Sequence, residues 1–310
     1  MWRYILKRLG MMVFVVAGVS IIIFTIMFFT PGDPAEIILG SSATPEEIAA
    51  LRHKMGLDLP YLAQLGNYLN DLVHLDFGES YSYGTSVWSE LEQRIPRTLT
   101  LGLMVICVQT LVGIPLGITA AVNAGKWQDT ACIVFAMLGL AMPGFWLSLM
   151  SVLLFSVKLG WVPPYGIDEW RCWILPVLTT SVVGISMNAR QTRAAMLDVI
   201  HSDYVTTAKA KGVSRRDVIW KHALPNALIP VITMIGSGFA NALGGSVIAE
   251  TVFTIPGVGL YITQGINQLD YAAVRSSVVI LSVWFSLVML ITDLVYAYVD
   301  PRIKAQYVGR

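Results

Sequence analysis

The chain has 310 residues, of which 55% are hydrophobic and 13% charged, and its formal net charge is +1. Soluble domains carry about 25% charged residues, so this composition excludes a disordered chain, a secreted disulfide scaffold and an ordinary cytosolic enzyme. The chain has 21 basic and 20 acidic residues and therefore lacks the large excess of positive charge that is typical of nucleic-acid binding, so we expect no nucleic-acid partner. A polytopic membrane protein remains.

Six apolar stretches are long enough to cross about 30 Å of hydrocarbon as helices. We therefore expect an all-α protein with six transmembrane helices, the third of them kinked at Pro143-Gly144. The first stretch has an apolar core of about 22 residues, longer than the roughly 7–15 of a cleaved signal, so we expect an uncleaved anchor. The six stretches are residues 9–30, 99–122, 130–157, 173–189, 227–249 and 278–299.

The distribution of Lys and Arg predicts the orientation, because cytosolic segments are enriched in these residues. If the N-terminus lies in the cytosol, the inner segments are together shorter than the outer segments, yet they carry 14 of the 21 Lys and Arg residues. We therefore expect a multi-pass protein with both termini in the cytosol. The inner segments are residues 1–8, 123–129, 190–222 and 300–310.

The outer segment between the first two spans, residues 31–98, is long enough to fold. Thr44, with Glu47 three residues on, forms a capping box that starts a helix, and Gly56 is placed to end it. Pro60 opens a second stretch, with leucines at helical spacing. We expect two short helices on the outer surface of the membrane.

The inner segment 190–222 predicts two short helices joined by a tight turn. Tyr204, Ala208 and Gly212 fall four residues apart, so one helix face is nearly bare, and Gly212 suits a helix end. Such a face lets another backbone approach closely, which favours docking into a groove of a partner protein. Some of the basic residues in this segment reflect only its position on the cytosolic side. A DNA-binding helix-turn-helix is disfavoured, because membrane spans hold both ends of the segment and a recognition helix needs freedom to enter a DNA groove.

The second helix of this pair begins after the turn. Ser214 and Asp217, three residues apart, form a capping-box pattern that starts it. The helix is expected to run to about Leu224 and to end at Pro225, which has no backbone N–H to continue the ladder.

The region of this helix pair contains Thr206-Thr207-Ala208, then Gly212, then Leu224-Pro225. These residues resemble the EAA motif of ATP-binding-cassette (ABC) importer permeases. That motif consists of E-A-A, three residues, G, nine residues and I-x-L-P. Thr206 stands in place of the glutamate and His222 in place of the isoleucine. The chain is closer still to the dipeptide, oligopeptide and nickel branch of this family. The stretches that carry this resemblance are residues 32–34, 56–58, 76–80, 203–212, 222–227, 250–253, 256–259 and 300–302.

The resemblance implies the type I ABC importer permease fold in the cytoplasmic (inner) membrane of a bacterium or archaeon. It implies an N-terminal anchor with an extracytoplasmic insert (residues 1–98) and a five-helix core (residues 99–310) with a coupling helix near residues 203–224. Expected partners are two ABC ATPase subunits, a second related permease, an extracytoplasmic solute-binding protein and membrane lipid. The ATPase-coupling residues would be Tyr204, Thr206, Thr207, Ala208, Gly212, His222, Leu224 and Pro225.

The sequence contains no G-x-x-x-x-G-K-[ST] motif, the loop that cradles nucleotide phosphates. We therefore expect that the chain is not an enzyme and holds no cofactor, and that the partner ATPases bind ATP and Mg. Closure of those subunits would move the helix pair and rock the spans between outward-open and inward-open states.

Polar and small residues recur every four positions in two spans, at Pro176, Thr180, Gly184 and Asn188 and at Thr233, Ser237, Asn241 and Gly245. Such stripes either line a wet cavity or pack helices closely, and the sequence leaves both readings open. Gln109, Gly113 and Gly117 predict a packing face on the second span. The candidate path residues are Thr180, Asn188, Thr233, Ser237 and Asn241.

The resemblance also places the outer loop after the fifth span near the entrance, where a binding protein delivers solute. Its candidate residues are Glu250, Phe253, Pro256 and Gly257, although Glu250 can equally be a carboxylate that snorkels to the surface. Asp293, the one acid well inside a span, is a candidate for structural pairing.

The family resemblance predicts import of dipeptides or oligopeptides. Nickel import by the same architecture is an alternative, although the four histidines are scattered and form no ligand cluster. The three cysteines include no C-x-x-C pair, and we expect no metal or redox site. An ion-coupled secondary transporter is a second alternative, but it predicts an inverted repeat that the sequence does not show.

Overall fold

The computed structural model describes residues 2–40 and 42–299, without the side chains at positions 2–4, 229, 233, 240, 241, 243, 245 and 296–299. The predicted motif at residues 300–302 lies outside the described residues. The described part of the chain is helical, with one isolated β-bridge between Glu79 and Ser86. The all-α class is therefore confirmed.

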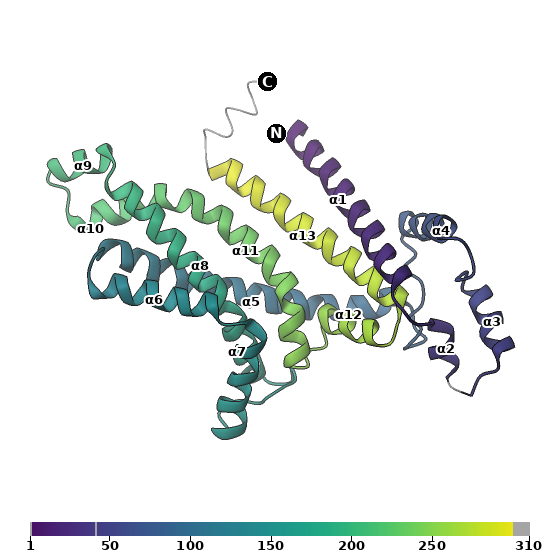
Figure 1. The fold of residues 1–310 in the computed structure, drawn as a ribbon. Helices are drawn as coiled ribbons and strands as arrows, with labels where there is room; N and C mark the ends of the chain where they lie inside the picture. The colour runs from purple at the N-terminus through teal and green to yellow at the C-terminus, as the bar shows by residue number, and fades with distance from the viewer. Residues whose placement is uncertain (1, 41, 300–310) are drawn as a thin grey trace. The chain divides into compact units, whose positions relative to one another are not determined.

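The long helices are α1 (Trp2–Phe29), α5 (Val87–Val122), α8 (Ile174–Ile200), α11 (Leu224–Val252) and α13 (Tyr271–Val299) (Figure 1). The shorter helices are α2 (Pro34–Leu39), α3 (Pro45–Lys54), α4 (Tyr61–Val73), α6 (Trp127–Ala141), α7 (Gly144–Ser151), α9 (Asp203–Ala210), α10 (Arg215–Asp217) and α12 (Val258–Asn267). Two π-helical stretches, η1 (Val152–Lys158) and η3 (Val218–Ala223), and one 3₁₀ turn, η2 (Trp170–Trp173), complete the described chain.

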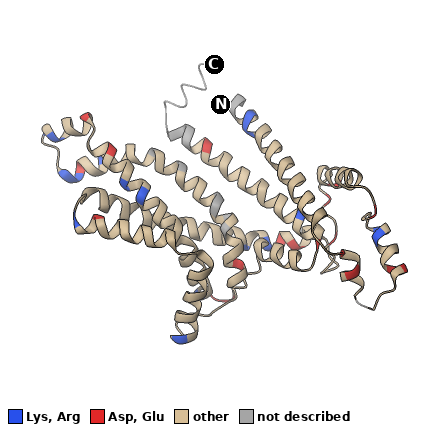
Figure 2. Ribbon diagram, viewed as in Figure 1, with Lys and Arg blue, Asp and Glu red and all other residues tan. Residues whose placement is uncertain are grey.

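Four of the described helices are long and apolar enough to cross a membrane unbroken. They are Ile5–Phe29, Val87–Val122, Trp170–Ile200 and Tyr271–Val295. Two bent pairs pass the same test together: α6 with the α7–η1 stretch, which turn by 97°, and Arg215–Leu228 with Pro230–Phe239, which turn by 50°. Counting each pair as one crossing gives up to six crossings among the described residues, which is the number predicted, although the second pair begins earlier than the predicted span 227–249. The charged residues are sparse along these helices (Figure 2).

The 97° break falls at Met142 and Pro143, where the sequence predicts a kink. Pro143 precedes Gly144 at the start of α7, and it cannot donate the backbone hydrogen bond that would continue α6. The predicted kink is thus confirmed, and it is sharp enough to separate two helices.

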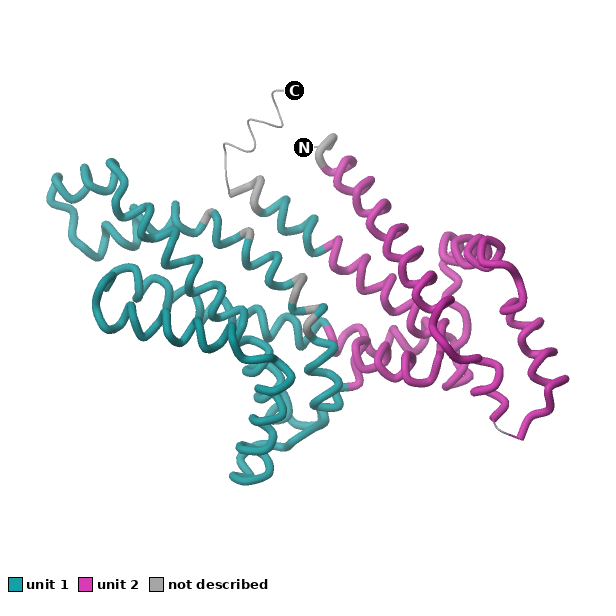
Figure 3. The backbone as a smooth tube through the Cα atoms, viewed as in Figure 1, with its two compact units in different colours: residues 1, 99–255, 288–310 teal, residues 2–98, 256–287 magenta. Residues whose placement is uncertain are grey.

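The chain divides into two compact units (Figure 3). Within the described residues, unit 1 comprises residues 99–255 and 288–299, and unit 2 comprises residues 2–98, without residue 41, and 256–287. Helices α5 and α13 contribute to both units. The predicted division into residues 1–98 and 99–310 stays a prediction.

In unit 1, glycines bring α5 and α8 into close backbone contact. A Cβ atom at Gly113 would lie 2.7 Å from Cβ of Asn188, and one at Gly117 would lie 2.5 Å from the carbonyl oxygen of Ala189. A Cβ at Gly184 would overlap the side-chain amide of Gln109. These approaches confirm the packing face predicted on the second span, because only small residues let helices come this close.

In unit 2, the local signals of the insert produce the predicted helices. Thr44 caps α3, since its hydroxyl accepts from the Glu47 N–H at 3.3 Å while the Glu47 carboxylate accepts from the Thr44 N–H at 2.8 Å. Gly56 has φ +69° just after α3, and α4 begins directly after Pro60. Helix α2, whose N-terminus is capped by Asp33, was not predicted.

The outer loop after the fifth span contains a helix, α12, that was not predicted from the sequence. Gly257 caps α12, and Tyr261 within it is fully buried in the core of unit 2 beside Leu91. Asp270, also buried, accepts from the Ser80 hydroxyl at 2.5 Å and from the Ser82 N–H at 3.1 Å. These bonds tie the loop before α5 to the start of α13.

Candidate functional site

The segment from Asp203 to Pro225 forms the predicted helix pair and is called the coupling segment below. Helix α9 ends at Ala210 with Lys211 as its C-cap, and Gly212 follows with φ +79°, a conformation that L residues with a side chain rarely adopt. The Val213 N–H reaches back to the Ala208 carbonyl at 3.3 Å. The predicted helix end at Gly212 is therefore confirmed, and its cause is backbone conformation.

The second helix of the coupling segment begins where predicted but does not end there. Ser214 caps it by accepting from the Asp217 N–H at 3.2 Å. The prediction that Pro225 ends this helix is wrong, because Pro225 lies in the first turn of α11, which continues to Val252. The π-helical stretch η3 directly precedes α11. A proline is tolerated in the first turn of α11, because a residue at that position loses no helical hydrogen bond.

The exposed face of α9 differs from the expected one. Ala208 is 7% exposed and Val205 is fully buried, so the small side chain of Ala208 allows α9 to pack against η3 of the same chain. The expectation that Ala208 offers a bare outer surface is wrong. The exposed side chains of α9 include those of Tyr204, Thr206 and Thr207.

The remaining predicted residues of the coupling segment lie on different sides of it. Gly212 is exposed, and a Cβ atom added there would meet nothing within 4 Å. His222 and Leu224 are half-buried, and Pro225 is exposed. Trp220, which is 55% exposed on η3, was not among the predicted coupling residues. An aromatic residue this exposed beside basic neighbours is the signal that could have identified it.

Two hydrogen bonds attach the coupling segment to the long helices of unit 1. Arg215 donates to the carbonyl of Val122, the last residue of α5, at 3.3 Å, and the Lys209 ammonium donates to the Ile200 carbonyl at the end of α8 at 3.4 Å. Buried Ala223 packs with a cluster that includes Met196 of α8. The coupling segment is therefore fixed to the ends of two spans.

The candidate path residues separate in the structure. Asn188 is 4% exposed, and its amide donates to the Gln109 carbonyl at 3.2 Å within the α5–α8 contact. Asn188 is thus a packing residue, because its amide is satisfied by a neighbouring helix. Thr180 and Ser237 are half-buried. The side chains of Thr233 and Asn241 lie outside the described residues.

Two of the four candidate outer residues, Phe253 and Pro256, have backbone carbonyls that accept hydrogen bonds from other segments. In unit 1, Glu250 is fully buried, which corrects the reading of a snorkelling carboxylate, and the carbonyl of buried Phe253 accepts from the Gly166 N–H at 3.2 Å. In unit 2, Arg97 donates to the Pro256 carbonyl at 3.0 Å. These contacts hold the chain on both sides of Ile255.

Among the residues that the structure describes, no three His, Cys, Asp or Glu side chains are grouped so that they could hold a metal ion. Asp293 is half-buried on α13. Its predicted pairing role stays a prediction.

Comparison with known proteins gives a consistent result over nearly the whole chain. Residues 113–305 match the model of the binding-protein-dependent transport system inner membrane component, and residues 1–102 match the model of the N-terminal part of such membrane components. The chain is 36% identical to the dipeptide transport system permease protein DppB of Alkalihalophilus pseudofirmus, over 98% of this chain and 100% of that protein. It is 38% identical to the glutathione transport system permease protein GsiC of Salmonella choleraesuis, over 98% and 99%.

The fold is also similar to that of a solved ABC transporter. A chain of the MetNI methionine ABC transporter in an inward-facing conformation matches with a TM-score of 0.58 at 18% identity. The match covers 68% of this chain and 96% of that one. At this identity the likeness concerns the fold.

Proposed function

The chain belongs to the family of binding-protein-dependent transport system inner membrane components, the permeases of ABC importers, and from this membership we propose that it carries dipeptides or oligopeptides across the cytoplasmic membrane. The observation that carries the proposal is the alignment, over 98% of the chain, with relatives named as dipeptide and glutathione permeases. Both relatives are named for small peptidic solutes. No comparable observation favours nickel.

The coupling segment is the proposed contact with the ATPases. Its exposed surface combines the aromatic rings of Tyr204 and Trp220 with the hydroxyls of Thr206 and Thr207. Aromatic side chains that are exposed on a rigid helical surface are typical anchors of protein–protein contacts. The basic residues that gather on α9 and α10 (Figure 2) favour an acidic rim on the partner.

Force would enter the spans through the attachments of the coupling segment. Arg215 joins it to the end of α5, and Lys209 joins it to the end of α8. The glycine contacts of Gly113 and Gly117 make α5 and α8 one closely packed pair. A displacement of the coupling segment when the ATPases close on ATP would therefore move both spans together, as in a rigid-body transition.

The solute path would run along α8 and α11. Half-buried Thr180 and Ser237 carry hydroxyls that can exchange hydrogen bonds with a passing peptide, and Thr233 and Asn241 are the further candidates from the sequence. Glu250 and Phe253 lie at the end of α11 that we assign to the outer face. The excess of Lys and Arg in the proposed inner segments supports cytosolic termini.

The proposal requires partner proteins that supply the energy, complete the path and deliver the solute. Two ABC ATPases would bind ATP and Mg, a second related permease would complete the path, and an extracytoplasmic binding protein would deliver the peptide. The family name itself refers to a binding protein. The permease would then contribute the path, the coupling segment and the membrane anchor.

The test is reconstitution of the complete transporter in liposomes, with the binding protein on the outside and ATP inside. Uptake of labelled alanyl-alanine is expected to require both ATP and the binding protein. A matched preparation in which an ATPase is inactivated at its nucleotide site is the control. Uptake of nickel in place of the dipeptide would refute the substrate, and uptake driven by an ion gradient without ATPases would refute the whole proposal.

A further inference from the structure

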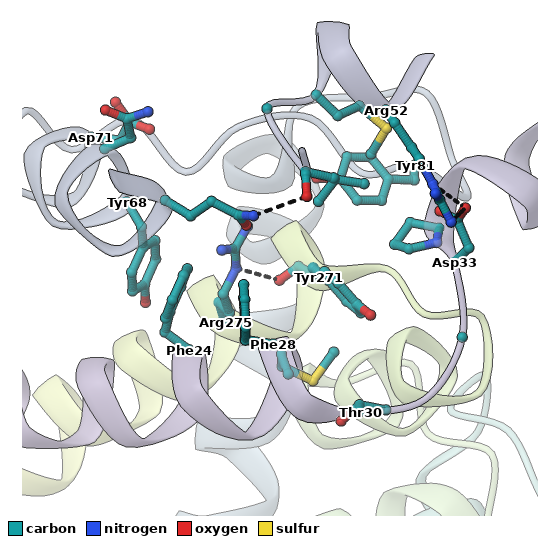
Figure 4. A pocket seen from close by; sticks show the side chains of 18 residues that line it. Phe24, Phe28, Thr30, Asp33, Arg52, Tyr68, Asp71, Tyr81, Tyr271 and Arg275 are labelled. Atoms are coloured by element: carbon teal, nitrogen blue, oxygen red, sulfur yellow. Dashed lines mark hydrogen bonds and ion pairs between the residues drawn. The ribbon is translucent and has the colours of Figure 1, made fainter. Parts of the chain in front are cut away.

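A cavity of 420 Å³ lies within unit 2, between the end of α1, the insert helices α3 and α4, and the start of α13 (Figure 4). Small-molecule sites have volumes of about 300–1,000 Å³. Its walls carry several aromatic rings, among them Phe24, Phe28, Tyr68, Tyr81 and Tyr271. The cavity is therefore large enough for a small solute and has walls that suit one.

Arg275 is the charged group that points into this cavity (Figure 4). Its guanidinium carbon lies 4.8 Å from the centre of the Tyr68 ring and 5.5 Å from that of the Phe24 ring. Its Nε donates to the Tyr271 carbonyl at 3.1 Å. Two ring faces and one hydrogen bond thus hold the guanidinium in a single orientation.

No carboxylate of the described chain lies within ion-pair distance of Arg275, and its two terminal nitrogens have no hydrogen-bond acceptor there. A half-buried guanidinium with free donors is poised for an anion, and its planar fork matches a carboxylate with two parallel hydrogen bonds. Because the fork is already fixed, little side-chain entropy would be lost on binding.

The other charges of the cavity are either neutralised or lie at its edge. Asp33 caps α2 through the Ala35 N–H at 2.9 Å and pairs with Arg52 at 2.5 Å, so neither group of this pair is available to a ligand. Asp71, three residues after Tyr68 on α4, is exposed (Figure 4). A positive group inside and a negative group at the edge match the two ends of a zwitterion.

We propose that this cavity binds a small zwitterion with a free carboxylate, an amino acid or a short peptide, and that Arg275 holds the carboxylate. The aromatic rings would cover the apolar part of the molecule, and Asp71 would face its ammonium group. The site lies in unit 2 and uses none of the residues that we assign to the path in α8 and α11. It does not depend on which solute the transporter carries.

The test measures binding of alanyl-alanine to the purified chain in phosphatidylcholine nanodiscs, by equilibrium dialysis. The dipeptide is expected to bind, and its C-terminally amidated form is expected to bind about tenfold or more weakly, because the amide loses the charge-assisted pair with Arg275. Equal binding of the acid and the amide in the unmodified protein would overturn the proposal. Full displacement of the dipeptide by inorganic phosphate at equal concentration would also overturn it, in favour of a phosphate site.

Variants then locate the binding within the chain. Arg275→Gln is expected to weaken dipeptide binding by about tenfold or more, and Arg275→Lys to weaken it less, because the charge remains while the fork is lost. Lys54→Gln removes an exposed positive charge of the insert that does not line the cavity, and it is expected to leave binding unchanged. Unchanged binding in a folded Arg275→Gln protein would refute the site, whereas the liposome uptake assay tests the transport function separately.

Discussion

The Asp129 carboxylate and the Arg193 guanidinium form a two-point ion pair that joins the start of α6 to α8, with N–O distances of 2.5 and 2.8 Å. Asp129 is 4% exposed, and it also accepts from the Gly125 N–H at 3.0 Å in the turn between α5 and α6. This turn and the end of α8, to which the coupling segment is attached, are therefore held together by one buried carboxylate.

Arg193→Met is expected to destabilise the protein by about 3 kcal/mol, because the buried Asp129 carboxylate would lose its charged partner. Thermal unfolding in detergent, followed by tryptophan fluorescence, measures the change. Arg190→Met, on the same helix at an exposed position without an ion pair among the described residues, is the matched control. Equal unfolding temperatures for the two variants would contradict the structural role of the pair.

Gly117→Ala is expected to destabilise unit 1 by about 1–3 kcal/mol, because the new methyl group would lie 2.5 Å from the Ala189 carbonyl and force α5 away from α8. Gly244→Ala is the control, since a Cβ there would meet nothing within 4 Å. Alanine favours a helix over glycine, so this control should be neutral or slightly stabilising. The same unfolding assay compares them, and a neutral Gly117→Ala would show that the helices are not in close contact.

Asp270→Ala is expected to loosen the loop that precedes α5, because Ser80 and Ser82 would lose their common acceptor. The amides of residues 77–86 should then exchange with deuterium faster, while those of α8 keep their protection. Glu46→Ala, at an exposed position in α3, is the control for removal of a carboxylate. Unchanged exchange in the loop would mean that the Asp270 bonds do not hold it.

His53 and Asp58 form an exposed pair at 2.7 Å in the insert, and each shifts the titration of the other. The hydrogen bond to Asp58 raises the pKa of His53 above its ordinary 6.5, and that from His53 lowers the pKa of Asp58 below 3.8. The stabilisation by charged His53 is thus full below pH 6.5 and is lost as the pH rises through the raised pKa. The stabilisation by ionised Asp58 is full above pH 3.8 and is lost as the pH falls through the lowered pKa.

NMR titration of the His53 ring protons measures this pair. The pKa of His53 should fall towards its ordinary value in Asp58→Asn, because the amide cannot stabilise the imidazolium as a carboxylate does. Glu92→Gln, which removes an exposed carboxylate of α5, is the control and should leave the His53 titration unchanged, because Asp58 is the carboxylate that shifts the pKa of His53. An unchanged His53 titration in Asp58→Asn would contradict the ion pair.

Thr207→Trp is expected to abolish the stimulation of ATP hydrolysis by the binding protein and peptide, because a large ring on the exposed face of α9 would block docking. Position 207 suits this test better than Gly212, where φ +79° would strain any bulky residue. A loss of stimulation in a Gly212 variant would not distinguish misfolding from blocked docking. Glu46→Trp, on exposed α3, is the control and should keep full stimulation. Normal stimulation in Thr207→Trp would place the ATPase contact elsewhere.

Sequence reasoning succeeded where a structure depends on nearby residues. The Thr44–Glu47 capping box, the helix ends at Gly56 and Gly212, and the break at Pro143 each follow from a few adjacent positions, and all four are present. Apolar length predicted the spans for the same reason, since crossing a bilayer is a property of one continuous stretch.

Three further errors concern packing between separate segments of the chain. Ala208 faces inward because η3 packs on it, and Asn188 is satisfied by Gln109, 79 residues earlier. Helix α12 was missed because its apolar residues are buried by other parts of unit 2, which a loop between two spans did not suggest. Periodicity identifies a face of a helix, but it does not reveal what covers that face.

The right-angled break after α6 has a consequence for the surrounding lipid. The 15 residues of α6 rise by about 22 Å, which is shorter than the roughly 30 Å of hydrocarbon in a typical bilayer. Phe145, Trp146 and Leu149 on α7 are exposed and apolar, which suits contact with lipid beyond the break. We expect the acyl chains beside α6 to shorten or tilt to meet it, so that this side of the permease is surrounded by a locally thinner membrane.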